Sequence, residues 1–223
     1  MEIDYTVKYS RRMTIALNVK EGKLVVRAPF WCSTEYIDTL IQKKMDWIIK
    51  NIAITKKTAE LREAFSLSYG DKIFYLGKEY PIVPRDGKTI GFDGTFFMPP
   101  GYTSEWIKLV CIEIYKSLAK ELLTDKVNEL AELFNLQHAG VRITNAKKRW
   151  GSCSSEKRLN FSWRLVMADE DLVNYVVVHE MAHLIEMNHS AYFWALVEEL
   201  IPDHKERRQR LNALNKQLSI KHW

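Results

Sequence analysis

An α+β fold is predicted by three features of this 223-residue sequence. Strand-like alternation of polar and apolar residues is frequent in the first 100 residues, helical periodicity dominates later, and a short strand pair interrupts the helical part. Pro99, Pro100 and Gly101 separate the two halves. We therefore expect a β-rich N-terminal region with one helix over 1–100 and a helical region with a short sheet over 101–223.

The composition is that of an ordinary folded protein. The chain is 47% hydrophobic and 27% charged, which excludes the disordered and fibrous classes. No segment approaches the roughly 20 apolar residues that span a bilayer, and the N-terminus lacks the apolar core of a secretory signal. Three cysteines without C-x-x-C spacing indicate neither a disulfide framework nor a thiolate zinc site. We expect a cytoplasmic protein without a membrane partner.

The first half contains strands and one helix. Two or three strands are expected within residues 5–28, where the alternation is interrupted by turn residues. Helical spacing of apolar residues predicts a helix over 33–52, with Ser33 or Thr34 as its N-cap. Two hairpins follow, over residues 72–83 and 89–99.

The second half opens on a long helix, expected over 104–136 with a break near 124–125. A strand, a compact loop and a second strand follow. Residues 158–167 alternate strictly between apolar and polar side chains, which predicts a strand with one buried and one polar face. That strand would pair with an extended peptide along a cleft. Three helical segments complete the chain, separated near residues 188–189 and 202–203.

The stretch NYVVVHEMAHLIEMNHSAYFW, residues 174–194, holds His179, His183 and His189, three of the six histidines in the chain. Apolar residues surround the whole circumference of the expected helix over 171–186, which indicates that the helix is buried. Acidic residues at 169–171 mark its start, where carboxylates cap free amides and complement the helix dipole. Buried ionisable side chains need partners, and a metal ion would supply one.

The spacing within this stretch suits a metal site. His179 and His183 are four residues apart and therefore share one face of a helix, so both imidazoles can reach a single ion. Glu180 is rotated from His179 by roughly 100°. Its carboxylate is thereby kept off the metal while remaining able to act as general base toward a water in the site.

A third ligand requires the helix to stop, because His189 would point away from the ion on an unbroken helix. Asn188 is a suitable stopping point, since asparagine tolerates a left-handed backbone, and Ser190 can cap the next helix. A carboxylate from that helix is the alternative third ligand, supplied by Glu198 or Glu199. Three neutral histidines leave the fourth tetrahedral position to water, as in catalytic zinc sites, so one zinc ion per chain is expected.

A resemblance to a known family adds to this interpretation. The stretches RWGSCSS, LNFSWRLVMA, VVVHEMAH, MNHSAYFW and PDHKERR, in this order, resemble the YgjP-like zinc metallopeptidases, which are related to the SprT-like group. YTVKYSRRMTIALNVKEGKLVVRAP and YLGKEYPI also resemble the N-terminal region of that family. The resemblance implies a zincin-like catalytic half, with His179, His183 and His189 as zinc ligands and Glu180 as catalytic base.

The leading hypothesis is therefore an HExxH-type zinc metallopeptidase that cleaves a peptide or protein substrate. One alternative is a metal-dependent nucleoside triphosphate phosphohydrolase, favoured by the net charge of +5 but supported by no phosphate-cradling glycine loop. A second alternative is a DNA-associated module with a metal site, suggested by the kinship to the SprT-like group and by the basic stretch KERRQR.

Five further residues are candidates for the site. Arg149 or Trp150 would contact substrate or brace the site, although packing is the favoured role for the tryptophan. Cys153 could approach the zinc as a thiolate, but nothing in its spacing requires this. Tyr192 and His204 carry hydrogen-bond donors that could stabilise an oxyanion.

Overall fold

The computed structural model describes residues 3–220 and Trp223, and it has the expected α+β fold. Two compact units are distinguished, one containing residues 3–65 and the other containing residues 66–219 with Trp223. The proposed division into a β-rich region and a catalytic region at residue 100 stays a prediction. Among the described residues, no helix has the length and apolar character needed to cross a bilayer.

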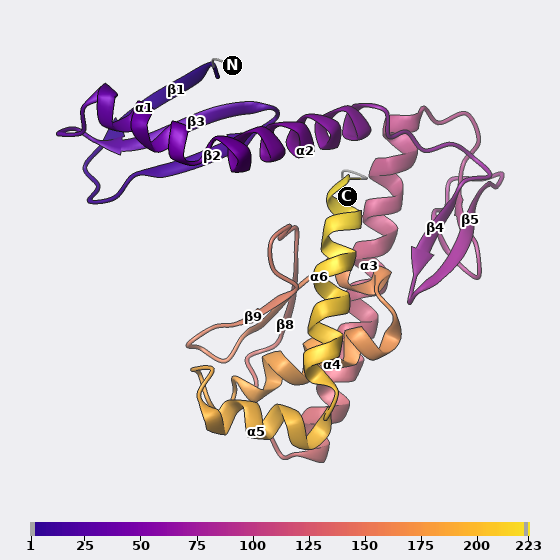
Figure 1. The fold of residues 1–223 in the computed structure, drawn as a ribbon. Helices are drawn as coiled ribbons and strands as arrows, with labels where there is room; N and C mark the ends of the chain where they lie inside the picture. The colour runs from indigo at the N-terminus through magenta and orange to yellow at the C-terminus, as the bar shows by residue number, and fades with distance from the viewer. Residues whose placement is uncertain (1–2, 221–222) are drawn as a thin grey trace. The chain divides into compact units, whose positions relative to one another are not determined.

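The first unit is a three-stranded sheet with two helices (Figure 1). Its strands are arranged in the order β1-β3-β2, with β1 and β3 parallel and β2 and β3 antiparallel. A tight turn at Glu21 and Gly22, both with positive φ, closes the β2–β3 hairpin. Apolar side chains of β3 and the helices form its core. The strands are β1 (Tyr5–Ser10), β2 (Ala16–Lys20) and β3 (Lys23–Pro29).

The single helix expected over 33–52 is wrong in two respects. The chain forms α1 (Thr34–Lys43) and α2 (Met45–Glu63), separated at Lys44, and α2 continues well beyond residue 52. Ser33 is the N-cap as expected, since its hydroxyl oxygen accepts a hydrogen bond from the Tyr36 amide at 3.3 Å. No proline or glycine marks Lys44, so hydrophobic periodicity alone could not reveal the break.

The second unit is built around α3 (Ser104–Leu133), a 30-residue helix (Figure 1). Thr103 caps its N-terminus. The break expected near residues 124–125 is wrong, because the helix runs through them and keeps one buried stripe along its length. A four-stranded sheet of two hairpins, ordered β4-β5-β7-β6, belongs to the same unit. Its strands are β4 (Lys72–Tyr75), β5 (Lys78–Pro84), β6 (Gly91–Phe92) and β7 (Phe96–Met98).

A second, smaller sheet in this unit has the order β8-β10-β9. β10 (Leu159–Ser162) lies in the centre, parallel to β8 (Val141–Thr144) and antiparallel to β9 (Gly151–Cys153). The strand expected over 158–167 is therefore wrong beyond Ser162, where the chain turns into a 3-10 helix, η1 (Trp163–Met167). Pairing of β10 with a peptide is also excluded, because both of its edges are occupied.

The polar face expected on residues 158–167 is buried at Ser162 and Arg164, which are 1% and 6% exposed. Both side chains donate hydrogen bonds to backbone carbonyls of the loop after β8. The Ser162 hydroxyl reaches the Ala146 oxygen at 2.7 Å, and Nη1 of Arg164 reaches the Asn145 oxygen at 3.2 Å. These bonds compensate the burial of the polar groups. They also hold the loop that leads to Arg149 and Trp150.

Three helices end the chain: α4 (Glu170–Ala182), α5 (Ala191–Leu200) and α6 (His204–Ile220). The acids at the start of α4 do not act as side-chain caps. Asp169 is the N-cap residue, but its carboxylate accepts a hydrogen bond from Arg210 of α6 at 2.7 Å. Asp171 also binds Arg210, and its backbone oxygen accepts from Arg207 at 2.9 Å. These bonds fix α6 against the beginning of α4.

Candidate metal centre

His179 and Glu180 lie in the last turn of α4, and His183 directly follows the helix as its C-cap. The helix is buried on most of its surface, as its apolar sequence predicted, so these ionisable groups are set in apolar surroundings. His183 and Glu180 are only 8% and 6% exposed. Burial of this kind is costly for polar and charged side chains unless they find a partner.

The chain reverses earlier than expected after this helix. α4 ends at Ala182, and Asn188 does not have a left-handed backbone, so the prediction that the helix stops at Asn188 is wrong. Hydrogen bonds from the Nδ1 of His183 to the Glu186 carbonyl and from the Asn188 amide to the Glu186 carboxylate, both 3.0 Å, hold the turn. Ser190 caps α5 as predicted, accepting from the Phe193 amide at 3.2 Å.

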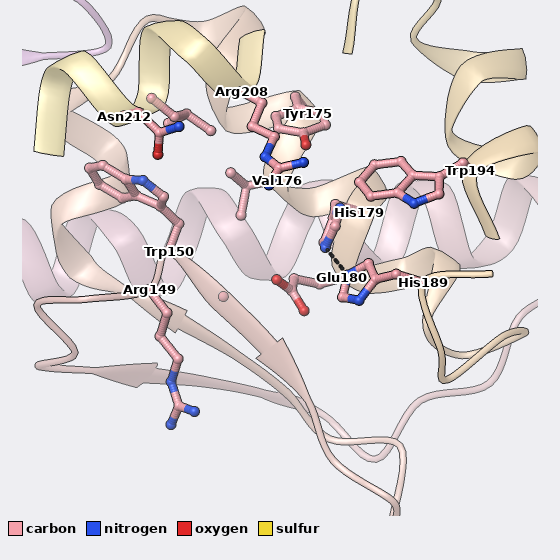
Figure 2. A pocket seen from close by; sticks show the side chains of 12 residues that line it. Arg149, Trp150, Tyr175, Val176, His179, Glu180, His189, Trp194, Arg208 and Asn212 are labelled. Carbon is pink, nitrogen blue, oxygen red and sulfur yellow. Dashed lines mark hydrogen bonds between the residues drawn. The ribbon is translucent and has the colours of Figure 1, made fainter. Parts of the chain in front are cut away.

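The three histidines converge. Their candidate ligand atoms all lie within 4.8 Å of one another, and among the described residues this is the only such group of histidine, cysteine or acidic side chains. The Nε2 atoms of His179 and His189 are 3.1 Å apart (Figure 2). Two nitrogens bound to one tetrahedral zinc at about 2.0–2.1 Å would be about 3.3 Å apart. The spacing of this pair is therefore close to that of two ligands of one zinc ion.

The hydrogen bond to the Glu186 carbonyl also defines the state of His183. Because the carbonyl only accepts, Nδ1 carries the proton, and in the neutral ring Nε2 therefore has the lone pair that a metal would bind. Ligating histidines usually donate their second ring nitrogen in this way. The Nδ1 of His179 is buried and has no hydrogen-bond partner among the described residues.

Aromatic side chains of α5 hold the imidazoles in place. The fully buried ring of Phe193 lies 4.9, 4.5 and 4.7 Å from the ring centroids of His179, His183 and His189. Trp194 stacks on His189 at 5.6 Å, and His204 stacks on Trp194 at 5.2 Å. This packing restricts the ring orientations before any ion binds.

The surroundings favour the neutral imidazoles of His179 and His189. Burial, followed by the neighbouring His183 and His189, lowers the pKa of His179 to about 3. Burial and His183 also lower the pKa of the exposed His189. Arg208 lowers both pKa values further. Since metals bind the neutral imidazole, these shifts keep the donors competent at neutral pH.

The Glu180 side chain projects into the pocket beside the histidines (Figure 2). Burial raises its pKa to about 8, and the positive charge of Arg149 opposes part of that rise. Gly151 of β9 packs directly on the carboxyl group: a Cβ atom built there would lie 2.5 Å from both Cγ and Oε1 of Glu180. The absence of a side chain at this position therefore makes room for the carboxylate.

A pocket of about 460 Å³ opens over these groups (Figure 2). β9 and the residues before it form one wall, while α4, α5 and α6 supply the remainder. Its polar side chains include two arginines, two histidines and one carboxylate. The lining residues are Arg149, Trp150, Gly151, Tyr175, Val176, His179, Glu180, His189, Trp194, Arg208, Leu211 and Asn212.

Of the five further candidates from the sequence, two line this pocket. Arg149 and Trp150 line it, whereas Tyr192, His204 and Cys153 do not. Tyr192 is 58% exposed, His204 is buried behind Trp194, and the Cys153 thiol is no part of the histidine group. Burial also raises the pKa of that thiol, which disfavours the thiolate needed for ligation.

Glu198 and Glu199, the alternative third ligands, are exposed on α5 and lie outside the histidine group. Sequence reasoning missed Tyr175, whose ring lies 5.9 Å from His179 in the pocket wall. Its position four residues before His179 on a helix was the available signal. Phe193 was missed as well, because a phenylalanine in an apolar helix carries no mark of its contacts.

Comparison with known proteins defines the class of this chain. The sequence model described as the YgjP-like metallopeptidase domain matches residues 13–214, nearly the whole chain. The chain therefore belongs to the YgjP-like family, and this membership supports a metal-dependent peptidase. No curated protein gives a significant match.

Two solved structures are similar to less than half of this chain. The metallopeptidase zymogen abylysin of Pyrococcus abyssi has 25% sequence identity and a TM-score of 0.37, with 40% of this chain and 90% of that chain covered. The metallopeptidase zymogen jannalysin of Methanocaldococcus jannaschii has 23% identity and a TM-score of 0.37, with 41% and 94% covered.

Substitution of Gly151 tests the contact with the carboxylate. Gly151→Ala should lower peptide cleavage, because the new methyl group displaces Glu180, while metal content stays at the wild-type level. The φ angle of Gly151 is not positive, so the backbone itself accepts alanine. Ser152→Ala on the same strand is the matched control and should cleave normally. Wild-type turnover by Gly151→Ala would show that the carboxylate has room to move.

Glu180 should also impose a pH dependence on the metal-free protein. Its folded pKa of about 8 lies above the ordinary value of 4.5. Glu180 therefore contributes to the free energy of unfolding, fully below pH 4.5, and this contribution is lost as the pH rises through about 8. We expect the melting temperature to fall between pH 6.5 and about 8. Glu180→Gln, which does not titrate, should remove this slope. Equal slopes for both proteins would contradict the burial of a neutral carboxyl group.

Proposed function

We propose that this chain is a zinc-dependent metallopeptidase in which His179, His183 and His189 hold one zinc ion and Glu180 is the general base. The observation that carries the proposal is the convergence of three imidazole donors within 4.8 Å, beside a buried carboxylate in the same pocket. Neutral imidazoles suit zinc, and three protein ligands leave one coordination position open for chemistry. Zinc bound there would act as a Lewis acid toward the scissile carbonyl and would lower the pKa of a water.

Glu180 is suited to proton transfer by its surroundings. A general base works best when its pKa lies near the operating pH, and burial shifts this carboxyl group upward into that range. A divalent cation beside it would favour the ionised form and moderate the shift. In the ionised form Glu180 takes a proton from the attacking water and later returns it to the leaving amine.

An extended peptide has one suitable strand to pair with at the pocket. β9 is an edge strand of its sheet, and its first residue, Gly151, lies in the pocket wall next to Glu180. Backbone groups along the outer edge of β9 are therefore placed to bind a peptide beside the carboxylate. This replaces β10, whose two edges are already paired. The membership in a metallopeptidase family supports a peptide or protein substrate.

Glu180→Gln tests the role of the base. The amide keeps the shape of the side chain but cannot accept the proton, so zinc content should be unchanged while peptide turnover falls by roughly 10² to 10⁴. Glu199→Gln, an exposed acid outside the pocket, is the control and should retain full activity. Turnover of a peptide library and of nucleoside triphosphates should be measured with zinc, magnesium and manganese supplied separately. Glu180-dependent hydrolysis of nucleotides without peptide cleavage would replace this proposal.

His189→Ala tests the third ligand. Loss of a residue that only hydrogen-bonds a metal ligand lowers metal affinity roughly 10- to 100-fold. Because His189→Ala removes a proposed ligand itself, zinc affinity should fall by at least that much. Glu198→Ala and Glu199→Ala are the matched controls and should retain one zinc per chain, because both side chains are exposed and lie outside the histidine group. Metal analysis of the purified variants gives the answer. Zinc loss in a glutamate variant with retention in His189→Ala would identify a carboxylate ligand.

A further inference from the structure

α6 carries three arginines close together, and they differ in their contacts. Arg207 donates to the Asp203 carboxylate and to the Asp171 backbone oxygen, both at 2.9 Å. Arg210 donates to the carboxylates of Asp169 and Asp171. Among the described residues, none forms a hydrogen bond or ion pair with Arg208. The first two arginines therefore have structural roles in attaching the helix, and the third does not.

Arg208 lies where a substrate would bind. It lines the pocket that contains His179, Glu180 and His189, and its guanidinium group is directed from α6 toward His179 (Figure 2). The side chain is exposed, so its donors are accessible. Tyr175 and Trp194 are further members of the same wall. An anionic group bound beside the histidines would therefore lie near an unpaired guanidinium.

The charges of the pocket favour the same kind of ligand. Arg149 and Arg208 are its cationic side chains, Glu180 is its one acid, and a divalent cation on the histidines would add further positive charge. Figure 2 shows the Arg149 guanidinium directed away from Arg208, so the two arginines mark different parts of the pocket. Arginine binds carboxylates through two parallel hydrogen bonds, an arrangement that a lysine or a neutral donor cannot reproduce.

We propose that Arg208 binds a carboxylate of the peptide substrate, so that the enzyme selects peptides with a carboxylate close to the scissile bond. This inference rests on the proposed peptidase function and names its substrate class. The carboxylate has two possible sources, the C-terminus of the peptide or an aspartate or glutamate side chain. Both present the same group to the guanidinium, and the experiment below separates them.

The test compares peptides that share one cleavage site. One series ends in a free carboxylate, a second is the same peptide amidated and uncharged, and a third is amidated with a single glutamate at each position in turn. Wild-type enzyme should cleave at least one carboxylate series with kcat/KM about 10- to 100-fold above the neutral series, the effect of one charge-assisted hydrogen bond. Preference for the first series identifies the C-terminus, and preference for the third identifies the side chain.

Three substitutions then assign the preference to Arg208. Arg208→Ala should bring the ratio of kcat/KM between carboxylate and neutral peptides close to one, mainly through KM. Arg208→Lys should restore only part of the ratio, because the bidentate geometry is lost. Arg208→Glu should favour peptides with a lysine at the selected position. Lys205→Ala, which removes a positive charge from the exposed face of α6 outside the pocket, is the control and should leave ratio and activity unchanged.

Binding without turnover provides a second readout. Calorimetric titration of the Glu180→Gln variant should give a lower Kd for the carboxylate peptide than for its neutral counterpart, and the difference should disappear in Glu180→Gln combined with Arg208→Ala.

Two results would overturn the inference while leaving the peptidase function intact. One is equal cleavage of neutral and carboxylate peptides by the wild type. The other is a uniform fall of kcat on all peptides in Arg208→Ala, which would assign the guanidinium to the developing oxyanion. Failure of the wild type to cleave any peptide would instead remove the proposed function itself.

Discussion

The candidate metal centre depends on where α4 ends. Continued as a helix, the chain would carry His189 away from His179 and His183, because six residues span more than one and a half turns. The chain instead leaves the helix at Ala182, and the hydrogen bond between the His183 ring and the Glu186 carbonyl stabilises the reversal. This single bond also places the proton on Nδ1. Turn formation and the choice of the free ring nitrogen are thus coupled in one side chain.

Several features of the candidate metal centre could be predicted from local sequence rules. Two histidines four residues apart must share a helix face, and the all-round apolar pattern of residues 171–186 indicated a buried helix. Ser190 as the N-cap of α5 follows from its own chemistry and was predicted. The end of α4 was predicted too late, because a side chain, and not a glycine or asparagine signal, satisfies the backbone there.

Residues whose roles depend on distant contacts could not be predicted. Nothing in the sequence near Gly151 shows that Glu180 will lie against it, and nothing near Phe193 shows that three imidazoles will surround its ring. Arg164 illustrates the same limit in the fold. The alternating pattern of residues 158–167 predicted that Arg164 lies on a polar face. The side chain is buried instead, and carbonyls of a separate loop accept its hydrogen bonds. Periodicity reports which side chains are apolar, but polar burial depends on tertiary partners.

The stack of His189, Trp194 and His204 gives the protein an intrinsic optical probe. The indole of Trp194 lies between two imidazoles, tilted by 28° from one ring and by 20° from the other. An excited indole is sensitive to charge on a ring it touches, so the emission of Trp194 would respond to the electronic state of His189. The chain has seven tryptophans, so the response of Trp194 to occupancy of the three-histidine group is the part of the emission change that is lost in Trp194→Phe.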